Sequence, residues 1–119
     1  MTDITDFYGK PIYTYTNKEA IEDGILFKIS DIKLFKNSII NIATTNLMNK
    51  GYWKQETQEI KINIPNIQDL LTQAIDHMTK KGKDTFYSLK IELPNGEKTK
   101  IFIAQNETGK FTVMLPEDY

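Results

Sequence analysis

Cysteine and arginine are both absent from this chain of 119 residues, and each absence excludes a class of function. Without cysteine there is no disulfide framework, no thiolate metal site and no thiol nucleophile. Without arginine there is no planar guanidinium for bidentate contacts to guanine, phosphate or carboxylate, and lysine does not reproduce it. The only histidine, His77, has no second histidine or cysteine to pair with, so we predict no catalytic role for it.

An excess of charge and long apolar runs are also lacking. All 15 basic residues are lysines spread along the chain, and 16 acids bring the net charge to −1. Long-range attraction to nucleic acid is therefore expected to be weak. No run approaches the ~18 apolar residues of a membrane span, and the N-terminus lacks the basic patch and apolar run of a secretory signal. We expect a cytoplasmic protein with no membrane partner.

The composition that is present is that of a globular domain. Hydrophobic residues make up 39% of the chain and charged residues 26%, which is ordinary usage and argues against a disordered protein. A chain of this length is large enough for one hydrophobic core but not for two. We therefore expect a single domain over residues 1–119, with residues 1–11 as a flexible lead.

The segment Ile12–Phe27, IYTYTNKEAIEDGILF, predicts a short capped helix. Thr16 and Glu19 have the spacing of a capping box, in which each side chain bonds the backbone N–H of the other. Gly24 suits the left-handed position that ends a helix, so Asn17–Asp23 is expected to form about two turns. Alternating apolar residues then predict a strand.

Two segments of the chain resemble a known family. They are IYTYTNKEAIEDGIL at Ile12–Leu26 and FTVMLPEDY at Phe111–Tyr119. The chain resembles a family of small proteins of unknown function, encoded by bacteria, phages and plasmids, with an IYxYTxxxAIEDGxL opening and an xTxMLPEED-like C-terminus. It departs from that family at Asn17, where members often have arginine, and in its long helix, which lacks their tryptophans. The resemblance implies a mobile-element setting, with no catalytic activity and no cofactor.

The clearest helix is predicted over Ile67–Lys80, with Asn66 as its N-cap and Gly82 as its end. One apolar stripe runs along it, made of Ile67, Leu70, Leu71, Ala74, Ile75 and Met78. A stripe of this kind packs on a sheet. A second main helix is predicted over Ser38–Lys50 from apolar residues at helical spacing, with a strand as the alternative because isoleucine, threonine and asparagine lower helix propensity.

Strands are predicted in the rest of the chain. Isoleucines alternate with polar residues from Glu59 until Pro65 ends the pattern, after a loop at Tyr52–Gln58. The last third predicts an antiparallel three-strand meander whose first loop, Pro94–Gly96, has a type I turn and a glycine bulge. That loop sets Ile91 opposite Thr99, and the same register places Leu89, Tyr87 and Glu92 opposite Ile101, Ile103 and Lys98.

The predicted fold class is therefore α+β. We expect a small antiparallel sheet, made of the C-terminal three-strand meander and one or two further strands. It would pack against two main helices and the short capped N-terminal helix.

Candidate protein-contact residues come from two segments. Tyr52 and Trp53 lie in the predicted loop, so they either tuck under the core or form a contact surface, because tryptophan is enriched in interfaces. In the N-terminal segment, the predicted capping box accounts for Thr16 and Glu19. It does not account for the identities of Tyr13, Tyr15, Glu22 and Asp23. The full set is Tyr13, Tyr15, Glu22, Asp23, Tyr52 and Trp53.

Two alternatives remain open. A nucleic-acid patch would combine Lys80, Lys81, Lys83, Phe86 and Tyr87, although lysines at a helix C-terminus are explained by the helix dipole alone. A small-molecule or enzyme site would use the carboxylates of Glu19, Glu22 and Asp23. No oxygen-ligand loop surrounds them, so no metal site is predicted.

The leading hypothesis is a non-enzymatic interaction module of a mobile element. It would bind a protein encoded by the host or by the element, without a cofactor. The C-terminal residues Glu117, Asp118 and Tyr119, together with the terminal carboxylate, are expected to form an acidic, solvated tail. The oligomeric state stays open.

Overall fold

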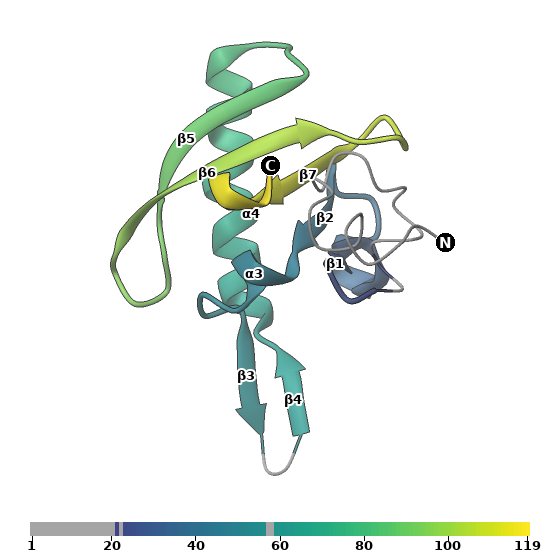
Figure 1. The fold of residues 1–119 in the computed structure, drawn as a ribbon, viewed down its shortest axis with the longest axis vertical. Helices are drawn as coiled ribbons and strands as arrows, with labels where there is room; N and C mark the ends of the chain where they lie inside the picture. Colours follow the sequence, from purple (N-terminus) through teal and green to yellow (C-terminus); the bar gives the residue numbers. More distant parts are fainter. Residues whose placement is uncertain (1–20, 22, 57–58) are drawn as a thin grey trace, which may run out of the picture.

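The described part of the chain, residues 21, 23–56 and 59–119, forms an α+β fold in a computed structural model (Figure 1). The predicted fold class is therefore confirmed. The strands are β1 (Leu26–Lys28), β2 (Ile40–Thr44), β3 (Trp53–Glu56), β4 (Glu59–Ile62), β5 (Phe86–Glu92), β6 (Lys98–Gln105) and β7 (Phe111–Met114). The helices are α3 (Thr45–Met48) and α4 (Ile64–Lys81), and short 3₁₀ turns cover Ile29–Asp31, Lys33–Phe35 and Pro116–Asp118.

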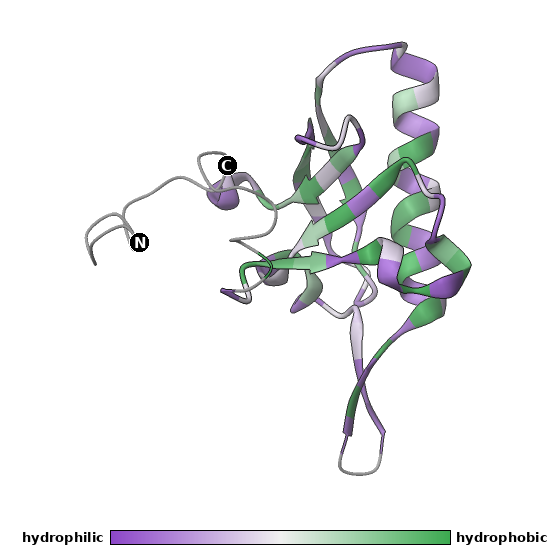
Figure 2. Ribbon diagram, turned by 90° about the vertical axis from the view of Figure 1, so that its right-hand side faces the viewer, coloured by the Kyte–Doolittle hydropathy of each residue, from purple (hydrophilic) through white to green (hydrophobic). Residues whose placement is uncertain are grey.

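The main sheet has five strands in the order β1-β2-β7-β6-β5, and β3 and β4 form a separate two-stranded sheet. Figure 2 shows α4 as one layer beside the main sheet, with the β3–β4 hairpin extending beyond both. All neighbouring strands of the main sheet are antiparallel except β2 and β7, which are parallel, with Ala43 opposite Val113. The sheet is therefore mixed, and the expectation of a purely antiparallel sheet was wrong.

The meander of β5, β6 and β7 forms as predicted. Ile91 lies opposite Thr99 and Leu89 opposite Ile101, which is the register that a three-residue loop sets. The loop closes with Leu93 N–H donating to the Glu97 carbonyl at 2.8 Å, and Gly96 takes the left-handed φ of 90°. Turn chemistry therefore determined this register locally.

The long helix α4 is also confirmed, although it starts earlier than predicted. Its stripe packs into the core, with Ile67, Leu70, Leu71, Ala74 and Met78 buried. Asn63, not Asn66, is the N-cap, because its side chain accepts from the backbone N–H of Asn66 at 3.2 Å. Pro65 lies in the first turn, where its missing N–H costs nothing. Pro65 therefore lies within the first turn of α4 and is not part of a linker between β4 and the helix.

The second main helix predicted over Ser38–Lys50 was wrong. Residues Ile40–Thr44 form the strand β2, and only Thr45–Met48 is helical. All five residues of β2 are buried, because the strand lies between β1 and β7. β-branched residues fit such a central strand, and this tertiary pairing outweighs their helical spacing. The described chain thus has one main helix.

The predicted N-terminal features lie mostly outside the described residues. These are the lead 1–11, the capping box of Thr16 and Glu19, and nearly all of the short helix. Gly24 is described and takes a left-handed φ of 74°. The predicted strand after it is present as β1.

The C-terminus is not a solvated tail. Asp118 accepts hydrogen bonds from the side chains of Thr44 at 2.6 Å and Asn46 at 2.7 Å. The ring of Tyr119 packs edge-on against Phe86 and Phe102 on the sheet face away from α4, with centroid distances of 5.2 and 5.8 Å. These contacts hold the last residues on the sheet.

Gly51 provides a test of the contact between the turn after α3 and the loop that joins β5 to β6. Its φ is 120°, and a Cβ there would lie 3.0 Å from Pro94 Cγ. Gly51→Ala is therefore expected to lower the free energy of unfolding by about 2–3 kcal/mol, from left-handed strain and the clash together. Urea unfolding measures it.

The matched control is Gly109→Ala. Gly109 also has a positive φ, of 84°, but no described atom lies within 4 Å of its Cβ position. It should cost only about 1–2 kcal/mol. Equal costs at both positions would contradict the contact with Pro94.

Candidate functional site

The β3–β4 hairpin, residues 53–62, projects from the body of the protein, and we call it the arm (Figure 1). No other strand of the described chain pairs with either of its strands. A two-stranded hairpin by itself is at most marginally stable in water. The contacts at its base therefore hold the arm in place, because no further described strand extends its two-stranded sheet. The prediction of a loop over Tyr52–Gln58 was wrong, because Trp53–Glu56 forms the strand β3.

The strand register divides the arm into two faces. Trp53 pairs with Ile62 and Gln55 with Ile60, so these four side chains share one face. The other face carries Lys54, Glu56, Glu59 and Lys61. Ion pairs join these charges, from Lys54 to Glu56 at 3.2 Å and from Lys61 to Glu56 at 3.5 Å and Glu59 at 3.7 Å. The charged face is thus neutral overall, and the face of Trp53, Gln55, Ile60 and Ile62 is mainly apolar.

The base of the arm is anchored to the body through Trp53. Its ring packs edge-on against Phe27 at a centroid distance of 5.4 Å, and its Nε1–H donates to Asn49 Oδ1 at 2.9 Å. Trp53 and Ile62 are both half-buried against the core. Part of the tryptophan surface is therefore used to hold the arm in place.

Ile60 continues the same face away from the core and remains 69% exposed. The predicted alternation of isoleucine and polar residues is present in β4, but nothing in the described chain covers the apolar face so far from the body. Ile60 therefore extends the apolar face of Trp53 and Ile62 into solvent.

Tyr52, by contrast, is a core residue with only 1% of its surface exposed. It cannot contact a partner in this fold. Of the two predicted alternatives, a side chain packed under the core and an exposed contact residue, the first is correct for Tyr52. No described residue hydrogen-bonds to its Oη. Burial, and then the negative charge of Asp69, raises the pKa of Tyr52 to about 12.

The N-terminal candidates are mostly beyond the described residues. Tyr13, Tyr15 and Glu22 lie outside them, as does Glu19 of the proposed carboxylate site. Asp23 is exposed in the turn before β1. Within the described ranges, no three histidine, cysteine, aspartate or glutamate side chains are grouped so that they could hold a metal ion.

The candidate nucleic-acid residues do not share one surface. Phe86 and Tyr87 are consecutive residues of β5 and point to opposite faces of the sheet. Tyr87 is buried, and its hydroxyl donates to the Gly82 carbonyl at 2.7 Å and accepts from Asp84 N–H at 2.9 Å. Lys80 forms an ion pair with Asp76 at 3.0 Å. No aromatic platform therefore accompanies Lys81 and Lys83.

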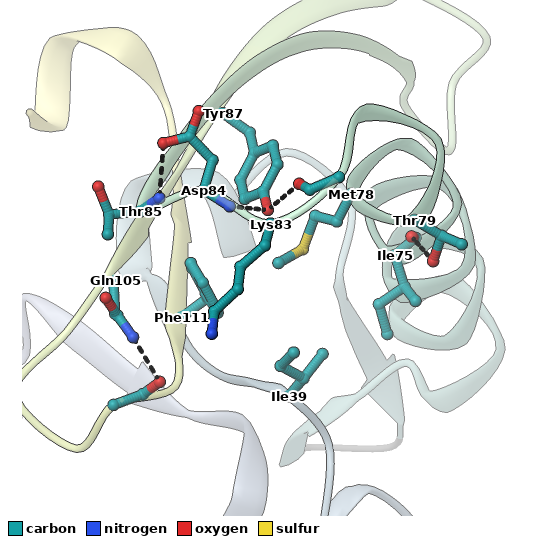
Figure 3. A pocket seen from close by; sticks show the side chains of 12 residues that line it. Ile39, Ile75, Met78, Thr79, Lys83, Asp84, Thr85, Tyr87, Gln105 and Phe111 are labelled. Carbon is teal, nitrogen blue, oxygen red and sulfur yellow. Dashed lines mark hydrogen bonds between the residues drawn. The ribbon is translucent and has the colours of Figure 1, made fainter.

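A pocket of about 810 Å³ opens at the C-terminal end of α4 (Figure 3). Its apolar lining comes from α4, from the residue before β2, and from the starts of β5 and β7: Ile39, Ile75, Met78, Tyr87 and Phe111. Lys83 lies at its edge. No short-range pattern in the sequence identifies this pocket, because its residues come from four separate segments. Ile39, 45% exposed, is a wall residue that no local pattern identifies.

Comparisons with known proteins add no relative. The chain matches no protein-family model, no curated protein and no solved structure. The family resemblance of the two end segments therefore stays an expectation. Among the described residues, no helix has the length and apolar character needed to cross a membrane.

The unpaired hydroxyl of Tyr52 generates a stability prediction. Burying a hydroxyl without a hydrogen bond is costly, so Tyr52→Phe is expected to raise the free energy of unfolding by about 1 kcal/mol at neutral pH. The control is Tyr87→Phe, which removes a bonded hydroxyl and should lower it by about 1 kcal/mol. Equal effects of the two substitutions in urea unfolding would contradict the assignment.

The pKa of Tyr52 predicts a separate alkaline effect. Its folded-state pKa of about 12 exceeds the ordinary value of 10.0, so its protonated form stabilises the fold fully below pH 10. That stabilisation is lost as the pH rises to 12, by about 1.4 kcal/mol per pH unit. The free energy of unfolding, measured across this pH range, should therefore fall more steeply for the natural chain than for Tyr52→Phe. Parallel curves would rule out the raised pKa.

Proposed function

We propose that this chain is a non-enzymatic protein-binding module and that the arm is its contact element. The observation that carries the proposal is the apolar face of the arm, which runs from the half-buried Trp53 and Ile62 to the exposed Ile60. A partner that covers this face would extend the core along the arm. Trp53 serves as the anchor at its base.

The charges of the arm favour a protein partner over a nucleic acid. Two lysines and two glutamates occupy the opposite face and are paired with one another. Such a surface releases no counterions from a phosphate backbone, which is the main source of affinity for nucleic acid. The exposed contact that remains is aliphatic. Aliphatic contact and strand pairing along a hairpin edge are both modes of protein recognition.

The size of the expected effect follows from Ile60. Complete burial of an isoleucine side chain contributes about 1.5–3 kcal/mol, and 69% of Ile60 is still exposed. Covering it would therefore contribute about 1–2 kcal/mol, or about tenfold in affinity. One such residue does not make an interface alone, so backbone pairing or the rest of the arm must supply more contact.

The setting we propose is a mobile genetic element, with a partner encoded by the host or by the element. Support comes from the resemblance of Ile12–Leu26 and Phe111–Tyr119 to proteins of phages and plasmids. The arm would supply the surface that such a partner contacts.

The first test places a photo-crosslinking amino acid at position 60 or at position 61 of the full chain, expressed in the cell that encodes it. Position 60 lies on the apolar face and position 61 on the charged face. We expect a defined crosslinked protein from position 60 in excess over position 61. Equal yields from both positions would contradict the arm as a face-specific contact.

The second test measures the affinity of the purified partner. Ile60→Gln is expected to weaken binding about tenfold, whereas Lys61→Gln should change it less than twofold, because exposed ion pairs contribute little. Both side chains are exposed, so unfolding curves should match the natural chain. An unchanged affinity for Ile60→Gln would exclude Ile60 as a contact residue.

A further inference from the structure

The pocket at the end of α4 has the size and lining of a small-molecule site. Its volume of about 810 Å³ falls within the range of about 300–1,000 Å³ that small ligands occupy. Aliphatic and aromatic side chains cover its interior, among them Ile75, Met78 and Phe111. Ile39 stays 45% exposed at its wall, which leaves an apolar surface open to solvent.

Most of the polar side chains of the lining are hydrogen-bonded within the protein. The Tyr87 hydroxyl bonds the backbone at Gly82 and Asp84, and Thr79 Oγ1 donates to the Ile75 carbonyl at 2.9 Å. The Gln105 side-chain amide donates to the Gly109 carbonyl at 2.9 Å. These groups hold the walls in place and leave little polar capacity for a ligand.

Lys83 supplies the positive charge of the lining. Figure 3 shows its side chain extending toward Ile39 and Phe111. No described carboxylate forms an ion pair with it. Asp84, the acidic residue of the lining, accepts instead from the backbone N–H of Thr85 at 2.7 Å. Among the described residues, the pocket therefore combines an apolar interior with a lysine ammonium that has no ion-pair partner, while the Asp84 carboxylate points away from it, toward Thr85 (Figure 3).

We propose that this pocket binds a small amphipathic carboxylate, with the apolar body against Ile39, Ile75 and Phe111 and the carboxylate on the Lys83 ammonium. The Lys83 ammonium is exposed, so a neutral apolar molecule would form no ion pair with it, and a cationic one would be repelled by it. A single ammonium suits a carboxylate held at one point and does not supply the several donors that a phosphate requires. This function goes beyond protein binding by the arm and does not depend on it.

The experiment uses three probes with the same alkyl body: octanoate, 1-octanol and octylammonium. Each is titrated into the isotopically labelled full chain below its micelle concentration and followed by amide chemical shifts. We expect octanoate to bind most tightly and octylammonium most weakly. The shifts should concentrate on residues around the pocket, such as Thr79, Thr85 and Gln105. Equal binding of octanoate and octylammonium would overturn the proposal.

Three variants locate the two parts of the site. Lys83→Met keeps the aliphatic stem and should weaken octanoate about two- to fivefold, the range of an exposed ion pair, without changing 1-octanol. Lys83→Glu should reverse the preference toward octylammonium. Ile39→Gln should weaken octanoate and 1-octanol alike, because it removes part of the apolar wall.

Lys81→Met is the matched control, since Lys81 is an exposed lysine of the same helix end that does not line the pocket. It should leave all three affinities unchanged. If Lys83→Met leaves octanoate unchanged, or if Lys81→Met has the same effect as Lys83→Met, the carboxylate does not sit on Lys83 and the proposal is wrong.

Discussion

The parallel pairing of β2 with β7 is the contact on which the rest of the fold depends. It joins the first strands of the chain to the C-terminal meander and buries every residue of β2 between β1 and β7. The arm and α4 both lie between these two strands in the sequence, so the pairing closes the chain around them. At the far end of β2, Thr44 holds Asp118 and also caps α3. The same strand therefore connects the C-terminus to the base of the arm.

Both candidate sites are built at the ends of this pairing. At the start of β2, Phe111 N–H donates to the Ile39 carbonyl at 3.0 Å, which sets two walls of the pocket beside the end of α4. Beyond the other end, α3 leads to Asn49, which holds Trp53 at the base of the arm. The two sites differ in their electrostatics. Charges on the arm are paired with one another, whereas Lys83 in the pocket is unpaired, so an apolar protein surface suits one and an apolar anion the other.

Prediction from sequence succeeded where neighbouring residues contain the whole cause. The stripe of α4 and the loop at Gly96 depend on periodicity and turn chemistry within a few residues, and both are present. It failed for Ser38–Lys50, because the partners that make β2 a strand come from β1 and from the distant β7. The N-cap was displaced to Asn63 for a smaller reason, since two asparagines flank Pro65 and either residue type can cap a helix.

The sequence by itself determined the α+β class, the long helix, the meander register and the exclusion of thiol and guanidinium chemistry. These follow from composition and from short-range pattern. Only the tertiary structure decided that Tyr52 is buried, that Ile60 is exposed, and that Lys83 lies over an apolar pocket. Exposure depends on what packs against a side chain, and for these three residues the answer lies in segments far away in the chain.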